Sequence, residues 1–293
     1  MELDYVKLKD IKPVLSGYIN RSKLMLKKSD VPDEKVVHDV RVLMKKSRAV
    51  LKLVAPQLEN DFSAKDIVSF REVGRKLSSW RDTSVHWRTL KDLRKEFPEL
   101  FSRLQENDKV AALFIKADPE QELSADVKAS LEEIDDLLEK AGYRIRFQSM
   151  DKIDPHLLLK ELEMTYLKVT EKYISCRNDP KNENIHEFRK RAKDFLYQLY
   201  FFRPLNVAVI KTLEKRLDSI TQNLGRYNDL AQLVNELGYN YKDKANTPFL
   251  DEMVIIVREK QDSYLAKVWP SAYKVFCPGT KLVNVLGFKL LVI

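Results

Sequence analysis

Apolar residues along this chain recur mainly at every third or fourth position, which is the period of amphipathic α-helices. No segment before the C-terminal tail shows the sustained polar–apolar alternation of a half-buried strand. Short breaks containing Pro, Asn or Asp separate the helical segments. Helices are therefore predicted over residues 5–29, 33–54, 64–79, 84–95, 122–140, 155–177, 183–203, 206–224, 227–237 and 248–275. Shorter helices are expected over 99–120, and a loop over 238–248.

Three segments carry finer expectations. The first helix should bend or restart near Pro13 and Gly17. The acidic helix over 122–140 should end at Ala141 and Gly142. The tail over 277–293 is apolar and weakly alternating after its Pro-Gly pair. Its pattern leaves three alternatives open: an edge strand, a patch packed on the core, or a segment with no native role.

Composition narrows the class of protein. Among 293 residues there are only 7 Gly, which argues against Gly-rich phosphate loops and tight-turn β architectures. The two cysteines, Cys176 and Cys277, support neither a disulfide framework nor a metal site. The amino terminus carries charges and no apolar signal region, and no apolar run reaches the roughly 18–20 residues that cross a bilayer. We therefore expect a cytoplasmic, all-α protein without metal or cofactor.

The net charge of +8 is distributed unevenly along the chain. Residues 1–100 carry 22 basic and 15 acidic side chains, residues 101–150 carry 7 and 11, and residues 151–293 carry 23 and 18. Two basic regions thus flank an acidic insert. This arrangement suggests two similar halves.

A repeated motif supports that division. Val37-His38-Asp39-Val40-Arg41-x-x-x-Lys45 matches Ile185-His186-Glu187-Phe188-Arg189-x-x-x-Lys193 at an offset of 148 residues. A second match, Leu77-x-x-Trp80-Arg81-Asp82 with Leu224-x-x-Tyr227-Asn228-Asp229, follows at an offset of 147. Two matches in the same order predict a duplicated helical unit.

Helical geometry places the basic residues of this motif on one side. At about 100° per residue, His38, Arg41, Lys45 and Arg48 fall within one arc, and the apolar residues fall opposite. His186, Arg189 and Lys193 take the same angles in the second copy, where Leu196 replaces Arg48. A stripe of like charges costs stability unless an anion neutralises it, so each stripe indicates a polyanion site. Arg offers a fork for phosphate oxygens, Lys a point charge, and His a proton that a nearby anion favours.

These segments together resemble the CHAD domain, the conserved histidine α-helical domain. HDVRVLMKKSR at 38–48 and LSSWRDTSV at 77–85 resemble its first half, IHEFRKRAKDFLYQLYFF at 185–202 and NLGRYNDL at 223–230 its second, and REKQDSYLAKVWPSAYKVF at 258–276 its last helix. The resemblance implies one domain over 1–276, with halves at 5–121 and 151–276 joined by the helix at 122–140. It implies two helical bundles related by a pseudo-twofold repeat, with a basic central cavity between them.

The resemblance also implies a function, which is binding of inorganic polyphosphate without catalysis, at polyphosphate granules. Carried over to this chain, the binding residues are His38, Arg41, Lys45, Arg48, Arg81, His186, Arg189 and Lys193. Second-tier candidates are Lys52, Arg75, Lys190 and Arg226. The partner expected is polyphosphate or another polyanion, and the oligomeric state is left open.

The sequence bears on three other classes of function. A hydrolase is not expected, because Glu161-Leu-Glu163-Met-Thr165 lacks the Lys of a triphosphate tunnel motif and lies in a predicted helix. No Walker loop, nucleophile elbow or zinc-binding His pair is found either. A nucleic-acid-binding helical protein is the alternative, and any such binding is expected to be non-specific. Its aromatic residues could serve as stacking platforms for bases, but aromatic residues at helical spacing belong mostly to the core. An accessory or scaffold module for polyphosphate metabolism is compatible with the same features.

Overall fold

The computed structural model describes residues 8–28, 32–58, 60–105, 125–240 and 247–287, and these contain helices and no strand. The helices are α1 (Ile11–Leu26), α2 (Glu34–Val54), η1 (Ala55–Gln57), α3 (Asn60–Lys76), α4 (Ser79–Glu96), α5 (Pro98–Gln105), α7 (Ala125–Phe147), α8 (Pro155–Asn178), α9 (Asn182–Phe202), η2 (Arg203–Leu205), α10 (Val207–Asn240), α11 (Thr247–Phe276) and α12 (Leu282–Val285). The all-α prediction is therefore confirmed for the described residues. Among them, no helix has the length and apolarity needed to cross a membrane.

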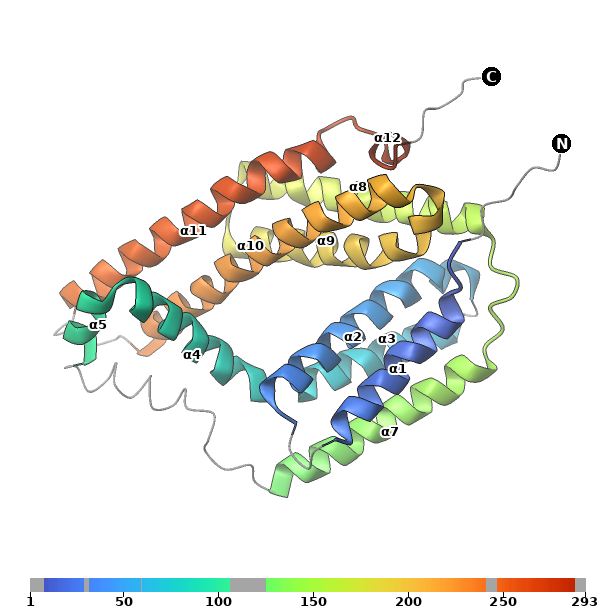
Figure 1. Ribbon diagram of the computed structural model, residues 1–293, viewed down its shortest axis with the longest axis horizontal. Helices are drawn as coiled ribbons and strands as arrows, with labels where there is room; N and C mark the ends of the chain where they lie inside the picture. Colours follow the sequence, from blue (N-terminus) through green and yellow to red (C-terminus); the bar gives the residue numbers. More distant parts are fainter. Residues whose placement is uncertain (1–7, 29–31, 59, 106–124, 241–246, 288–293) are drawn as a thin grey trace.

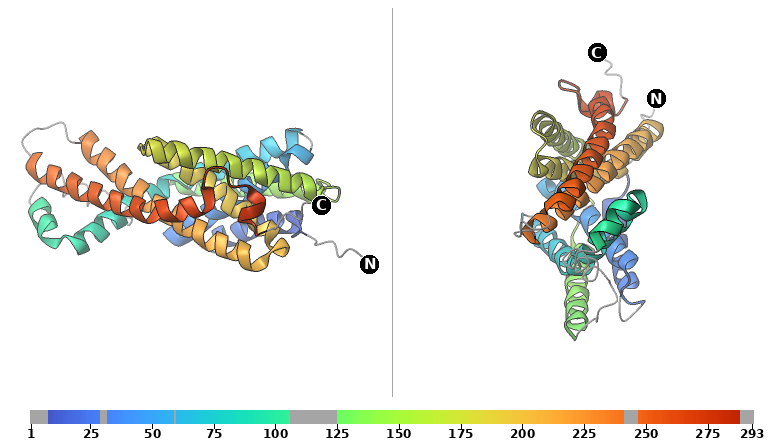
Figure 2. Two further views of the ribbon diagram at one scale, coloured as in Figure 1. Left: turned by 90° about the horizontal axis from the view of Figure 1, so that it is seen from above. Right: turned by 90° about the vertical axis from the view of Figure 1, so that its left-hand side faces the viewer.

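The helices form two groups that lie side by side. Helices α1, α2, α3 and α7 pack on one another, and α8, α9, α10 and α11 form the second group (Figure 1). Helix α2 contacts α9 and joins the groups, while α4 and α5 extend from the first group to α10 and α11. The molecule is consequently elongated, with α5 at one end (Figure 2).

The contact between α2 and α9 combines apolar burial with polar links. Gln198 donates from Nε2 to the main-chain oxygen of Ala49 at 2.9 Å. One turn farther along α2, Lys52 lies 2.6 Å from the carboxylate of Asp194. Buried side chains of both helices belong to one hydrophobic core, which also contains the aromatic cluster of Tyr166, Tyr173, Phe188, Phe195 and Phe276.

Several predicted breaks do not interrupt the helices. Helix α7 continues past Ala141 and Gly142 to Phe147, because Ala141 and Ile145 are buried in the core and compensate for the low helix propensity of glycine. Helix α10 likewise runs through 225–226, where two helices had been predicted. Helix α4 begins at Ser79, so the stretch over 80–83 is helical and the break falls at 77–78.

The two ends of the chain also differ from prediction. Helix α1 begins at Ile11 and continues through Gly17, with Pro13 in its first turn, where the missing N–H has no helical partner to lose. In the tail, Leu282 and Leu286 are buried in the core, and Asn206 donates to the main-chain oxygen of Leu286 at 3.2 Å. The described part of the tail is thus a core-packed patch. Residues 288–293 lie outside the described residues.

Candidate anion-binding groove

Helix α2 presents the first basic stripe away from the core. Its start is fixed by Asp33, whose Oδ1 accepts a hydrogen bond from the amide of Val36 at 2.7 Å. The opposite side of the helix is buried, which leaves Arg41, Lys45 and Arg48 half-buried and His38 exposed. The predicted separation of a basic and an apolar side is confirmed for α2.

The α2–α3 groove is a cavity of about 240 Å³ beside this stripe. Its described lining residues are Arg41, Met44, Lys45, Arg48, Phe70, Arg71, Gly74, Arg75 and Ser78. Five of these residues are cationic and none is a carboxylate. A concave surface with one sign of charge and low-dielectric walls concentrates ions of opposite charge, so the α2–α3 groove is suited to an anion.

One arginine on each stripe is held by a main-chain oxygen of the following helix. Arg41 donates from Nη1 to the oxygen of Gly74 at 2.7 Å, and Arg189 donates from Nε to that of Thr221 at 3.2 Å. In the second case the guanidinium lies against Gly225, where an added Cβ would be 3.1 Å from Arg189 Nη2. Both side chains are therefore positioned before any ligand arrives.

Burial shifts the protonation equilibria of this region. The pKa of Arg48 is lowered, mainly by burial and further by the charge of Arg71, although Asp194 opposes the change. The pKa of His186 is also lowered from 6.5, first by burial and next by Arg189, with Lys45 contributing across the two groups of helices. These pKa shifts share one cause, which is that positive charge is held partly out of water. An incoming anion would offset this desolvation cost.

The stripe on α9 is weaker than that on α2. Lys193 lies 3.3 Å from Asp218, and Lys190 lies 2.8 Å from Glu187. The pKa of Lys193 is nonetheless lowered by burial, with Asp218 opposing the change. Asp218 stands 147 residues after Arg71, which is the offset of the second repeated motif, so in the sequence a carboxylate occupies the position that matches Arg71.

Of the remaining predicted residues, the structure places only some in the α2–α3 groove. His186 is exposed on α9, Arg75 lines the α2–α3 groove while paired with Glu72 at 2.8 Å, and Lys52 is paired with Asp194. The side chain of Arg81 lies outside the described residues. Arg226 lines a different cavity, so the structure does not bring it to the basic groove.

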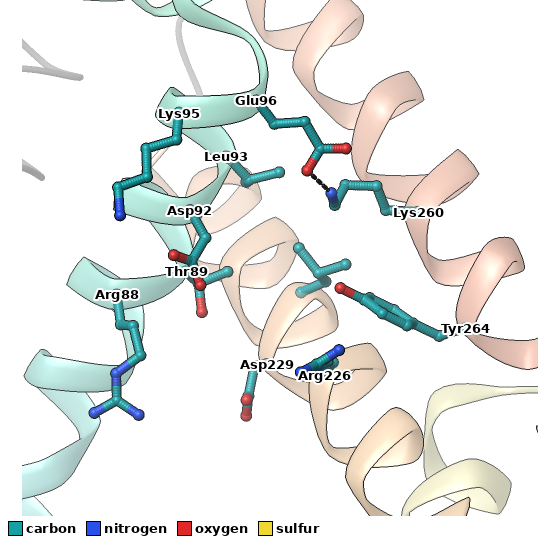
Figure 3. A pocket seen from close by; sticks show the side chains of 11 residues that line it. Arg88, Thr89, Asp92, Leu93, Lys95, Glu96, Arg226, Asp229, Lys260 and Tyr264 are labelled. Carbon is teal, nitrogen blue, oxygen red and sulfur yellow. Dashed lines mark hydrogen bonds and ion pairs between the residues drawn. The ribbon is translucent and has the colours of Figure 1, made fainter. Parts of the chain in front are cut away.

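That other cavity lies between α4, α10 and α11 and measures about 700 Å³ (Figure 3). Its charged lining residues have both signs: Arg88, Lys95, Arg226 and Lys260 with Asp92, Glu96 and Asp229. Lys260 and Glu96 form an ion pair across it. Despite its larger volume, this cavity is less suited to a polyanion than the α2–α3 groove, because its own carboxylates compete for the cations.

Sequence reasoning missed several residues of the groove region. Arg71 lines the α2–α3 groove and lies one turn before Arg75 on α3. The spacing of 71, 75 and 78 was a readable signal, since these positions share one side of a helix. Asp194 and Asp218, which neutralise part of the basic region, carried no such signal because their partners come from other turns or helices.

Comparison with known proteins identifies the family of this chain. The sequence model of the CHAD domain family matches residues 23–237. The chain belongs to the CHAD domain family. A crystal structure of the CHAD domain from the plant Ricinus communis is similar over 99% of this chain and 96% of its own, with a TM-score of 0.50 and 16% identity. At that identity the similarity concerns the fold alone. A search of curated protein sequences finds no match.

Proposed function

We propose that this CHAD domain binds inorganic polyphosphate without hydrolysing it, and that the α2–α3 groove is the main contact. The observation that carries the proposal is the groove's described lining, which contains five cations and no carboxylate: Arg41, Lys45, Arg48, Arg71 and Arg75. A chain of phosphates supplies several negative charges in a row. Cations from successive turns of two helices offer a matching row.

The energetics favour a long anion over a single phosphate. Arg48 is half-buried and its charge is disfavoured by desolvation, so an anion beside it recovers part of that cost. Each cation that pairs with a phosphate also displaces counterions from the polyphosphate. The favourable free energy of counterion release grows with the number of contacts. Affinity should therefore rise with chain length and fall with salt.

The second stripe extends the proposed site. His186, Arg189 and Lys193 would serve a longer chain that leaves the groove, on a surface where Lys45 already acts electrostatically on His186. In this proposal the two halves are copies related by a pseudo-twofold repeat around a basic central cavity. The equivalent hydrogen bonds of Arg41 and Arg189 support the repeat. Association with polyphosphate granules in the cytoplasm follows from the same binding.

Two adjacent lysines of α2 provide a matched test. Lys45 lines the groove, whereas Lys46 lines another cavity, with its ammonium 5.8 Å from the ring centroids of Tyr18 and Tyr197. Calorimetric titration with polyphosphates of increasing length should show about tenfold weaker binding for Lys45→Ala and near wild-type binding for Lys46→Ala. For Lys45→Ala, the slope of log binding constant against log salt concentration should be shallower by about the contribution of one phosphate contact.

Equal losses in the two lysine variants would overturn the groove as the site, because net charge alone would then explain binding. Affinity that does not change with chain length would do the same. Competition by RNA or DNA at moderate salt tests the specificity for polyphosphate. Incubation with polyphosphate and divalent ions, followed by a phosphate assay, should release no phosphate; release would overturn the non-catalytic assignment.

A further inference from the structure

Helix α8 carries an apolar stripe on its outer side that nothing among the described residues covers. Leu157, Met164, Leu167 and Ile174 are 46%, 42%, 51% and 37% exposed. At about 100° per residue they fall within an arc of roughly 100°, so they share one side of the helix. Figure 2 shows α8, in yellow-green, running along the outer edge of the molecule. Large apolar side chains that are exposed together on one side of a helix are typical of an interaction site.

The stripe is symmetric about its own centre. Leu157 and Ile174 are equidistant from the midpoint between Thr165 and Tyr166, and so are Met164 and Leu167. Two charged residues on the same side, Lys160 and Glu171, are also equidistant from that midpoint, and their charges are opposite. Both are exposed.

This symmetry describes a surface that is complementary to itself. If two copies of α8 run antiparallel about a twofold axis at that midpoint, every apolar residue of the stripe faces an apolar residue. Each Lys160 then faces a Glu171 of the other copy, and this pair occurs twice. A parallel arrangement would instead place Lys160 against Lys160 and Glu171 against Glu171.

We propose that the protein forms a twofold-symmetric homodimer through α8, with the two helices antiparallel. Such an isologous contact is the commonest form of oligomer symmetry. Glu171 already contacts Lys172 at 2.8 Å, but that pair is solvent-exposed and is readily exchanged for a partner in a dimer. A single pair of helices is a small interface, so the dimer is reversible and depends on concentration. None of the stripe residues lines the α2–α3 groove, and dimerisation is therefore independent of the proposed polyphosphate binding.

Charge reversal tests the contact by sedimentation equilibrium. The wild-type protein should dimerise as its concentration rises, and Lys160→Glu or Glu171→Lys should each shift dissociation about tenfold or more toward monomer. A 1:1 mixture of the two variants should restore the dimer, because every opposed pair is then of opposite sign, and so should the double variant. Lys215→Glu makes the same charge change at an exposed site on α10 and should have no effect.

Cysteine cross-linking tests the orientation. Seventeen residues of helix separate positions 157 and 174 by about 25 Å, so the two ends of the stripe are resolved. In a Cys277→Ser background, a mixture of Leu157→Cys and Ile174→Cys should form a disulfide-linked dimer, and Leu157→Cys alone should not. A wild-type protein that stays monomeric at every concentration, or efficient cross-linking of Leu157→Cys alone, would overturn the proposal. Neither result would bear on polyphosphate affinity, which is measured separately.

Discussion

Arg41 donates a hydrogen bond from Nη1 to the main-chain oxygen of Gly74, 2.7 Å away, and this contact fixes a cation of α2 against α3. Arg189 makes the corresponding contact with Thr221 on α10, but there the guanidinium also lies over Gly225. The two glycines thus have different surroundings. An added Cβ at Gly74 would meet nothing within 4 Å, whereas one at Gly225 would be 3.1 Å from Arg189 Nη2.

This difference predicts opposite outcomes for two identical substitutions. Gly74→Ala should stabilise the protein by up to about 1 kcal/mol, because alanine is the better helix former and the site has room. Gly225→Ala should give little or no gain in stability and should weaken polyphosphate binding, since the Arg189 guanidinium must move. Urea denaturation and calorimetry check the pair. Equal stabilisation with unchanged affinity in both would show that Gly225 does not position Arg189.

The ion pair between Lys52 and Asp194 predicts a trade between stability and binding. Asp194 is the less exposed partner, at 15%, and its charge also acts on Arg48. Asp194→Asn should lower the free energy of unfolding by about 1 kcal/mol, because Lys52 loses its partner at the contact of α2 with α9. The same substitution should tighten polyphosphate binding several-fold by removing a competing carboxylate. Glu183→Gln, an exposed acid on α9, is the control; a variant weakened in both properties would contradict the prediction.

The sequence predicted the helices and the basic stripe of α2 because both depend on local periodicity. Helices α2, α8 and α9 begin and end within a residue or so of their predicted bounds, where proline or a capping residue marks the end. The prediction failed at Gly142 and Gly225, where helix-breaking residues are overridden by contacts with distant parts of the chain. Gly142 lies near Ile19 and Gly225 near Arg189, and neither contact leaves a trace in local sequence.

The residues of the candidate site were also predictable where they follow from the periodicity of one helix. Arg41, Lys45 and Arg48 share one side of a helix, and the structure places all three in the α2–α3 groove. Arg226 was predicted as a second-tier contact, yet it lines the mixed-charge cavity beside α4 and α11. Side-chain groupings that depend on packing between helices, such as Arg71 with Arg48, could not be read from periodicity along one helix.

The buried carboxylate of Asp66 predicts a stability change that depends on pH. Its side chain is 0% exposed and accepts a hydrogen bond from Arg144 Nε at 2.8 Å. Burial raises the pKa of Asp66, and Arg144 opposes the rise. Arg144→Ala removes that opposition and should cost about 3–5 kcal/mol at neutral pH, where a buried charge is left without its partner.

The sign of the pH effect follows from the raised pKa. Protonated Asp66 is tolerated in the folded state, so its contribution is favourable at low pH and is lost as pH rises through the folded-state pKa. The difference between wild type and Arg144→Ala should therefore shrink near pH 4. Urea denaturation at the two pH values checks this, with Arg146→Ala, an exposed arginine on the same helix, as control. A difference that is equal at both pH values would assign the loss to packing.

The lowered pKa of His186 predicts how the affinity for polyphosphate changes with pH. Burial and then Arg189 lower the pKa of His186 from its ordinary value of 6.5, which favours the neutral imidazole in the free protein. A bound polyanion favours the protonated form and raises that pKa, and binding then takes up a proton. Affinity should accordingly increase as pH falls below neutrality, and it should level off once His186 is also protonated in the free protein. His186→Gln should flatten this profile, whereas His156→Gln, at an exposed position on α8, should leave it unchanged. Calorimetry in buffers of different ionisation enthalpy measures the proton uptake directly, and the same uptake in His186→Gln as in wild type would show that another group is responsible.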